Sequence, residues 1–287
     1  MTDTQIYGIW GAMVRRTLSP KGREALDVYP TAQELYEDRY SASMLLGRKD
    51  APKLLGFDPE KARNIAEICE HNGIRIYLSE SDEFPQRLLD CEEPPELVFS
   101  FGSAEMALNA HTIAVVGSRT CDAYSESVTR RISADLARAG ITVISGFARG
   151  IDTAAHKGAL DAGGSTVAFL GSGLLYDYPN NTMDLKRMIS NRGAVITEYL
   201  PNEICLPNYF LSRNRLIAGC SEAVLCTQAS IRSGSLSTVR HALAQGKPVF
   251  VTPPHDIYDE TYGGIISLLR DGAVQVYSSK DIIDAMM

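Results

Sequence analysis

Four short segments rich in glycine, serine and arginine hold the side chains of this sequence that are best suited to bind an anion. They are Gly-Ser-Arg at 117–119, Ser-Gly-Phe-Ala-Arg-Gly at 145–150, Gly-Ser-Gly at 171–173 and Arg-Ser-Gly-Ser at 232–235. Small residues let backbone N–H groups approach a ligand closely, and arginine presents a forked set of donors that matches phosphate oxygens. The shared chemistry predicts phosphate as the ligand, although a single segment of this kind is also typical of an ordinary tight turn.

A fifth segment, 211–219, places Arg213 and Arg215 at the predicted start of a short helix. Acidic residues would stabilise that end of a helix, because the helix dipole is positive there. Two arginines at this position instead indicate an external anion. The alternative is that one of them pairs with Glu198 or Asp152.

The usual nucleotide-binding and catalytic motifs are not found in the sequence. The Gly-x-Gly at 171–173 lacks the third glycine of a dinucleotide-binding loop, and no Gly-Lys-Ser/Thr is present for a Walker A loop. The six cysteines do not have the spacing of a zinc site. Asp152 and His156 are four residues apart, but we interpret Asp152 as the N-cap of a helix. We therefore predict no catalytic residue, no metal site and no cofactor.

The segments that carry this chemistry follow apolar runs that alternate with helical patterns from Thr112 onward. We predict strands at 113–116, 142–144, 166–170, 195–197, 223–226 and 248–251, and helices at 125–139, 153–162, 182–190, 213–219, 236–245 and 265–270. Continuous apolar strands that alternate with helices predict an α/β fold with a doubly wound, mostly parallel sheet covered on both faces. Such sheets bind ligands outside the carboxyl ends of their strands, where these segments begin.

The N-terminal part has a different pattern. Helices are predicted at 4–16, 32–46 and 58–71, followed by an extended stretch from Ile74. We therefore predict two domains, a small helical domain over 1–73 and an α/β domain over 74–287. The helical domain is interpreted as a packing module, with a DNA-backbone clamp or a partner dock as the alternatives.

The composition limits the class of protein. The chain has 287 residues, 45% of them hydrophobic, and a formal net charge of −7. That charge disfavours coating of nucleic acid by the whole surface, so any nucleic-acid site must be a local patch. No apolar stretch reaches the length of a membrane span and the N-terminus does not resemble a signal peptide, so we expect a cytoplasmic protein.

Taken together, these segments resemble the DNA-processing protein A (DprA/Smf) family. The resemblance is carried by VGSR at 116–119, SGFARGID at 145–152, AH at 155–156, YP at 178–179, EY at 198–199, RNRLIAG at 213–219 and SGSL at 233–236. It extends upstream to the Phe-Pro at 84–85 and the Pro-Pro at 94–95. It covers at least residues 77–273.

The resemblance implies an extended Rossmann-like domain preceded by a sterile-alpha-motif-like (SAM-like) domain. It implies a non-enzymatic protein that binds and protects single-stranded DNA and loads the RecA recombinase in natural transformation (competence) or recombination, usually as a homodimer and without a membrane. The candidate nucleic-acid-binding residues are Gly117, Ser118, Arg119, Gly146, Arg149, Arg213, Asn214, Arg215, Arg232, Ser233 and Gly234. Arg119, Arg213 and Arg215 are expected to hold phosphates, with Phe147 or Tyr209 as candidates for base stacking.

Several positions depart from the family pattern, among them Leu211 in place of the proline of a Phe-Pro and Pro254 in place of the glycine of a Pro-Gly. Gln228 stands where family members usually have an acid, and Thr182 where they usually have an Asn. Asn180 stands where some members have a basic residue. Ile266 stands where members usually have another Asn. Gln228, Thr182 and Asn180 predict a weaker grip on phosphate, and the other departures predict that the function is not strictly equivalent to that of the family. Two other functions stay open: a nucleotide sensor or nucleotide-cleaving hydrolase, although the loop at 233–238 lacks the catalytic Glu of such enzymes, and a DNA-free scaffold that docks a recombinase.

Overall fold

The computed structural model describes residues 2–286, which divide into two compact units. The first unit contains the residues up to Phe84 together with Pro95–Phe99, and the second contains Pro85–Pro94 and Ser100–Met287. Within residues 2–286, no helix combines the length and apolar character that crossing a bilayer requires. Each unit is described by itself below.

The described residues of the first unit up to Phe84 form six helices followed by strand β1. The elements are α1 (Asp3–Thr17), α2 (Pro20–Ala25), α3 (Ala32–Glu37), α4 (Arg39–Leu45), α5 (Ala51–Leu55), α6 (Pro59–His71) and β1 (Arg75–Leu78). The helix predicted over 32–46 is wrong in one respect, because the chain breaks it at Asp38, which ends α3 and precedes α4. The Asp38 carboxylate accepts a hydrogen bond from the Tyr29 hydroxyl at 2.7 Å, and this contact accompanies the break.

Helix α1 and strand β1 pack closely in this unit. Gly8 of α1 faces Leu78 so tightly that an added Cβ would lie 2.2 Å from a Leu78 methyl carbon. Trp10 is fully buried, and its indole N–H donates to the Phe57 carbonyl at 3.3 Å. This packing groups residues 74–84 with the helices in one compact unit. The domain boundary expected after residue 73 stays a prediction.

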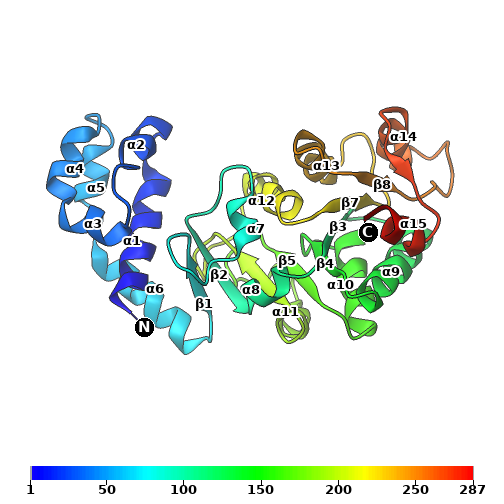
Figure 1. Ribbon diagram of the computed structural model, residues 1–287, viewed down its shortest axis with the longest axis horizontal. Coiled ribbons are helices and arrows are strands. Elements are labelled where there is room, and N and C mark those ends of the chain that lie inside the picture. Colours follow the sequence, from blue (N-terminus) through cyan, green and yellow to red (C-terminus); the bar gives the residue numbers. More distant parts are fainter. Residues whose placement is uncertain (1, 287) are drawn as a thin grey trace. The chain divides into compact units, whose positions relative to one another are not determined.

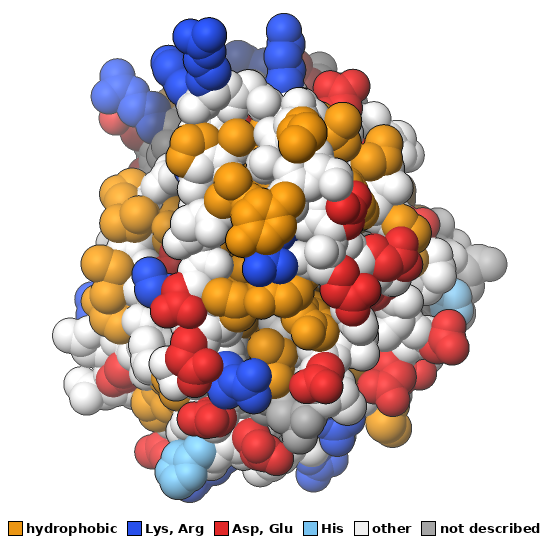
Figure 2. All heavy atoms as spheres, turned by 90° about the vertical axis from the view of Figure 1, so that its left-hand side faces the viewer, with side chains coloured by type: hydrophobic (Ala, Val, Ile, Leu, Met, Phe, Trp, Pro, Cys, Tyr) orange, Lys and Arg blue, Asp and Glu red, His pale blue; other side chains and the backbone are white. Residues whose placement is uncertain are grey.

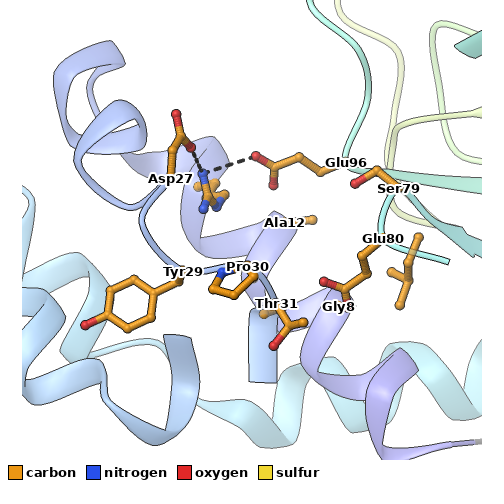
Figure 3. A pocket seen from close by; sticks show the side chains of 13 residues that line it. Gly8, Ala12, Asp27, Tyr29, Pro30, Thr31, Ser79, Glu80 and Glu96 are labelled. Atoms are coloured by element: carbon orange, nitrogen blue, oxygen red, sulfur yellow. Dashed lines mark hydrogen bonds and ion pairs between the residues drawn. The ribbon is translucent and has the colours of Figure 1, made fainter. Parts of the chain in front are cut away.

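The helical unit contains an acidic cleft of about 380 Å³ beside α1 (Figure 3). Three carboxylates, those of Asp27, Glu80 and Glu96, line it. The Arg15 guanidinium lies 2.8 Å from Asp27 and 3.5 Å from Glu96. Burial raises the pKa values of Glu80 and Glu96. With three acids and one arginine, the cleft has the wrong sign of charge for a phosphate.

The same unit exposes an apolar face. Figure 2 shows hydrophobic side chains gathered on the side of the molecule where α4 and α5 lie in Figure 1. The exposed apolar side chains of these two helices are Tyr40, Met44, Leu45 and Leu55, with exposed fractions of 43 to 85%. Neither the acidic cleft nor this apolar surface matches the predicted phosphate chemistry. A further hollow of the unit, of about 590 Å³, is lined by Lys21, Arg48, Lys49 and Lys53 together with Asp50, and its charge does suit an anion.

The second unit is organised around parallel strands. They are β3 (Thr112–Val116), β4 (Thr142–Ser145), β5 (Thr166–Phe169), β6 (Ala194–Thr197), β7 (Ala223–Cys226), β8 (Val249–Val251) and β9 (Val274–Gln275), and β2 (Leu97–Gly102) leads into the unit. Their order is β6-β5-β4-β3-β7-β8-β9, and every neighbouring pair is parallel. The order reverses between β3 and β7, so the carboxyl ends of these two strands mark the topological switch point at which such sheets bind ligands.

Helices cover both faces of the sheet, which confirms the predicted doubly wound α/β class (Figure 1). One face carries α9 (Ala123–Arg138), α10 (Ile151–Asp161) and α15 (Ser279–Met286), whose apolar side chains form one buried cluster with β3, β4, β7 and β8. The other face carries α12 (Pro207–Gly219) and α13 (Ser235–Ala244). The remaining helices of this unit are α7 (Gln86–Leu89), α8 (Ala104–Leu108), α11 (Met183–Ser190), η1 (Glu260–Tyr262) and α14 (Gly263–Arg270).

Helix α12 starts earlier than the sequence analysis expected. It begins at Pro207, a residue that suits the first helical position because its missing N–H would be unpaired there. Arg213 and Arg215 therefore lie beyond the first turn, where the helix dipole no longer disfavours a cation. The inference of an external anion from their position at a helix start was wrong, so the role of these arginines depends on their contacts.

Candidate nucleic-acid interface

A crevice of about 450 Å³ lies at the switch point, between the loops that follow β3 and β7 and the flank of α12. Seven of the predicted site residues line it: Gly117, Ser118, Arg119, Arg213, Asn214, Ser233 and Gly234. They come from three parts of the chain that the parallel sheet brings to one edge. The expectation that these segments share one edge is confirmed for the β3 loop, the β7 loop and α12, and also for the 145–150 segment, whose Ala148 lines the crevice. The Gly-Ser-Gly at 171–173 does not line it.

The loop after β3 is held rigidly in the crevice wall. The Ser118 N–H donates to the Gln228 carbonyl at 2.8 Å, and the Ser118 carbonyl accepts from the Ile151 N–H at 3.1 Å. Gly117 must be a glycine, because a Cβ would lie 2.7 Å from Ile151 and 2.8 Å from the Gln228 carbonyl. Gly150 has a φ of 73°, and a Cβ there would lie 2.3 Å from the Ser118 carbonyl. The loop is thus preorganised, and its small residues are required by close backbone packing.

A second groove of about 400 Å³ continues from the crevice. It is lined by Arg119, Thr120, Ala148, Arg149, Tyr178, Pro179 and Asn180. Arg119 and Ala148 line both hollows, so the two are joined at Arg119. The exposed Asn180 contributes a neutral amide where some family members have a cation. Together the hollows form one extended track along the edge of the sheet.

Arg213 lies beneath the crevice. Its side chain is buried, with 4% exposed, and its Nη1 donates to the carbonyls of Gly146, at 2.6 Å, and of Phe169. Burial lowers the pKa of Arg213 to about 10. Gly146 faces this guanidinium, because a Cβ there would lie 2.7 Å from Nη2. Arg213 therefore forms part of the crevice floor, and its Nε is buried without a hydrogen-bond partner among the described residues.

Arg215 points away from both hollows and forms a double ion pair. Its Nη1 and Nη2 lie 2.7 and 2.6 Å from the two carboxylate oxygens of Glu198, and its Nε donates to the Glu93 carbonyl at 3.1 Å. This is the pairing that the sequence analysis gave as the alternative to phosphate binding. In this arrangement the charge of Arg215 is already compensated.

Asp152 also lines the crevice, and His156 lies one turn further along α10. The N-cap of α10 is Gly150, so the N-cap role expected for Asp152 is wrong; the Asp152 carboxylate instead accepts the Ala148 N–H at 3.2 Å from within the first turn. His156 is fully buried, and its Nδ1 lies 2.7 Å from the Thr166 hydroxyl. Burial lowers the pKa of His156 to about 3, so the ring is neutral near pH 7. A neutral, enclosed imidazole of this kind stabilises the fold.

Three arginines at the rim are exposed: Arg119, Arg149 and Arg232. None of them forms a hydrogen bond or an ion pair with another residue in the range 2–286. The Arg119 guanidinium lies 4.9 Å above the ring of Phe210, a contact that leaves its donors free. Arg149 lines the second groove, and Arg232 precedes Ser233 of the crevice wall. The rim thus offers uncompensated positive charge. Of the predicted residues, Gly146, Arg215 and Arg232 line neither hollow themselves, although Arg232 is adjacent to Ser233 of the crevice wall.

The aromatic residue that lines the crevice was not among those expected from the sequence. Phe147 is 3% exposed and packs toward His156, with ring centroids 6.0 Å apart. Tyr209 stacks on Tyr199 at 4.0 Å. Phe210, the next residue along α12, lines the crevice instead. The signal available in the sequence was its position beside the Arg-Asn-Arg segment, which became meaningful once α12 was seen to begin at Pro207.

Gln228, one of the departures from the family pattern, has a structural role. Its amide Nε2 donates to Asp122 at 3.2 Å and to Thr261 at 2.9 Å, and its Oε1 accepts the Asp122 N–H at 3.1 Å. The side chain thereby ties the β7 loop to the start of α9 and to η1. It is 1% exposed, so it offers no contact to a ligand in the crevice.

A family of known proteins is similar in sequence to this chain. A family model described as DNA recombination-mediator protein A matches residues 75–287. The DNA processing protein DprA of Bacillus subtilis is 30% identical over 257 residues, which cover 90% of this chain and 84% of that protein. The DNA processing protein DprA of Streptococcus pneumoniae is 37% identical over 202 residues, which cover 70% and 71% of the two chains.

Two solved structures are similar over most of their length. The structure of DNA processing protein A from Streptococcus pneumoniae has a TM-score of 0.82 at 28% identity and covers 99% of this chain and 98% of that one. A structure that describes the single-stranded DNA binding mode of DNA processing protein A from Helicobacter pylori has a TM-score of 0.66 at 27% identity. It covers 74% of this chain and 95% of that one.

Proposed function

The chain belongs to the DNA recombination-mediator protein A family, and from that membership we propose that it binds single-stranded DNA along the joined crevice and groove of its second unit. The observation that carries the proposal is the set of three exposed arginines, Arg119, Arg149 and Arg232, around this track. Their charges are not compensated by neighbouring residues, although the chain as a whole is acidic. A local cationic track in an acidic protein favours a localised polyanion over a general coating of nucleic acid.

Each part of the track has a role in this proposal. Arg119 contacts a phosphate at the junction of the two hollows, and Arg149 and Arg232 contact phosphates on either side. Ser233 and the backbone of Gly234 supply neutral donors, as small residues at strand ends do for phosphate. Ser118 shapes the wall, because its N–H and its hydroxyl already donate to the carbonyls of Gln228 and Thr120. Arg213 adds positive charge from beneath without touching the strand.

We also propose that the protein acts without catalysis, as a cytoplasmic homodimer that protects incoming or recombining single strands and hands them to the RecA recombinase in transformation or recombination. The family description as a recombination mediator supports this role. A nucleotide hydrolase would need an exposed acid at the track. Among the described residues that line the two hollows, the one carboxylate is Asp152, which is 7% exposed and engaged with the Ala148 N–H.

The test is a binding titration with a fluorescent oligonucleotide, single-stranded or in duplex, over a range of salt concentrations. If three or four phosphates are neutralised, log affinity should fall with log salt with a slope of roughly −2 to −3, at about 0.7 per phosphate for a single strand. Arg119→Ala should weaken binding of the single strand about ten-fold, by loss of one charge-assisted contact. Arg131→Ala, which removes an exposed arginine from α9, is the matched control. Binding that is independent of salt, or equally tight for duplex, would overturn the proposal.

A further inference from the structure

Two free cysteines of the second unit lie against each other. The Sγ atoms of Cys91 and Cys220 are 3.8 Å apart, although the two residues are 129 positions apart in the sequence. Cys91 follows the end of α7, and Cys220 is the C-cap of α12. Both side chains are buried, with 5% and 0% exposed, and neither lines the crevice or the groove. The fold thus brings together two thiols that the proposed function does not use.

The backbone segments that carry the two thiols are in close contact. Gly219 precedes Cys220, and a Cβ added to it would lie 2.3 Å from the Sγ and 2.9 Å from the Cβ of Cys91. Both thiols donate to the Arg87 carbonyl, at 3.4 Å from Cys91 and 3.7 Å from Cys220. The sulfur atoms must approach by about 1.8 Å to reach the bond length of a disulfide, about 2.0 Å. Rotation about the two Cα–Cβ bonds moves the sulfur atoms without moving the backbone.

The surroundings make the two thiols chemically different. The hydrogen bond with Cys220 lowers the pKa of Cys91, and the charges of Arg215 and Lys247 act in the same direction. Burial raises the pKa of Cys220. The Lys247 ammonium is fixed beside the pair, because it donates to the Gly219 carbonyl at 2.7 Å. The thiolate is the reactive form of cysteine, so Cys91 is the nucleophile of the pair and Cys220 is the thiol that resolves it.

We propose that Cys91 and Cys220 are a redox modification site, at which a peroxide converts the two thiols into a reversible disulfide that joins the segment after α7 to the end of α12. This inference goes beyond the proposed function and does not depend on it. In a reducing compartment, a disulfide of this kind is transient and responds to oxidants, whereas a permanent structural disulfide is rare.

The chemistry balances with hydrogen peroxide as the oxidant. The Cys91 thiolate attacks one peroxide oxygen, the O–O bond breaks, and the products are a sulfenic acid on Cys91 and a hydroxide that takes up the proton lost by Cys91. The Cys220 sulfur then attacks the Cys91 sulfur and displaces its hydroxyl group, which leaves as water with the Cys220 proton. Two thiols are oxidised to one disulfide, and one peroxide is reduced to two waters.

The bond should stabilise the fold without closing the DNA track. It lies at the C-terminal end of α12, beyond Arg213 and Asn214, which line the crevice. A disulfide restricts the unfolded chain more strongly when it closes a longer loop. For a separation of 129 residues, we expect the urea midpoint of unfolding to rise by about 1 M on oxidation. Affinity for single-stranded DNA should stay the same.

The experiment treats the folded full-length chain with a small molar excess of hydrogen peroxide and then blocks the remaining thiols with N-ethylmaleimide. Mass spectrometry of the intact protein and of its peptides follows. We expect wild type to lose two hydrogens, to yield a peptide pair joined through Cys91 and Cys220, and to return to its starting mass with dithiothreitol. Cys91→Ser and Cys220→Ser should not form this pair. Cys121→Ser, which removes a partly exposed thiol, is the matched control and should form it as wild type does.

Two outcomes would overturn the inference. In the first, Cys121 or Cys205 is oxidised while Cys91 and Cys220 are still free thiols when the protein is unfolded for blocking. In the second, Cys91 is oxidised to a sulfinic acid with no bond to Cys220. Both are read from wild type, so they do not depend on the folding of a variant. Equal urea midpoints for the oxidised and reduced forms would contradict the expected stabilisation.

Discussion

At the rim of the crevice, Arg119, Arg149 and Arg232 are exposed and meet no acceptor among the described residues, whereas Arg213 and Arg215 below the rim are surrounded by acceptors. The sequence analysis gave all five arginines the same predicted role, which is to bind an anion. The difference lies in the partners that the fold supplies: backbone carbonyls for Arg213, and a carboxylate for Arg215. An arginine in one of these segments therefore indicates a binding site only when the fold leaves its charge uncompensated.

The comparison implies two different consequences of mutation. In the proposed function a rim arginine stabilises the complex with DNA. It contributes little to the stability of the folded state, because exposed charges interact weakly with the rest of the protein. A floor arginine satisfies buried carbonyls, so its loss leaves polar groups without partners. Substitution of a rim arginine should therefore weaken DNA binding and leave the free energy of unfolding almost unchanged, whereas substitution of a floor arginine should lower the free energy of unfolding.

The largest effect is expected for Arg213→Ala. The substitution leaves the carbonyls of Gly146 and Phe169 without their donor and opens a cavity, so we expect the free energy of unfolding to fall by about 2 to 4 kcal/mol. Urea unfolding followed by circular dichroism measures it. Arg119→Ala should change the same quantity by less than about 0.5 kcal/mol. Equal stability of the two variants would remove the distinction between rim and floor.

The layout of the second unit could be predicted from the sequence because its signals are local. Each buried parallel strand, such as 113–116 or 223–226, is a continuous apolar run, and the glycine-rich loops follow directly. The burial of Arg213 could not be predicted in this way, since the acceptors on Gly146 and Phe169 come from 67 and 44 residues away in the sequence.

Short elements were also missed. Strand β9 has two residues and helices α2 and α5 have six and five, too few to show a hydrophobic period. Helix α15 was missed although its eight residues contribute Ile282 to the core. Contacts between residues far apart in the sequence, and elements too short to show a period, could therefore not be predicted from the sequence.

The floor should also determine how the protein responds to acid. His156 has a pKa of about 3 in the folded state and about 6.5 when unfolded, so the unfolded chain takes up a proton first as the pH falls. Stability from this residue is present above pH 6.5 and is lost as the pH falls toward 3. We expect wild type to lose about 1.5 kcal/mol more than His156→Asn between pH 6.5 and 5, measured by urea unfolding at each pH. The exposed His71→Asn should follow wild type, and parallel curves for all three proteins would contradict the expectation.

The acidic cleft of the helical unit provides a second contrast with the rim. It is of similar volume to the crevice, about 380 against 450 Å³, but its charged side chains are Asp27, Glu80, Glu96 and Arg15 (Figure 3). A phosphate strand is repelled by such a surface, since like charges close together raise the energy of the complex. The size of a hollow therefore does not identify the proposed DNA site, and the sign of its charge disfavours the acidic cleft.

The smallest effect is expected for Arg232→Ala, which tests the contrast between the rim and the acidic cleft. Arg232→Ala removes one rim charge, so we expect affinity for a single strand to fall about two- to four-fold and the salt slope to become shallower by about 0.7, the value of one phosphate contact. Glu80→Gln, which removes one charge from the acidic cleft, should leave the slope unchanged, because that cleft makes no phosphate contact. Fluorescence titrations at several salt concentrations measure both quantities. A change of slope in Glu80→Gln as large as in Arg232→Ala would mean that the helical unit takes part in binding, and the strand would then have to be traced beyond the crevice and groove.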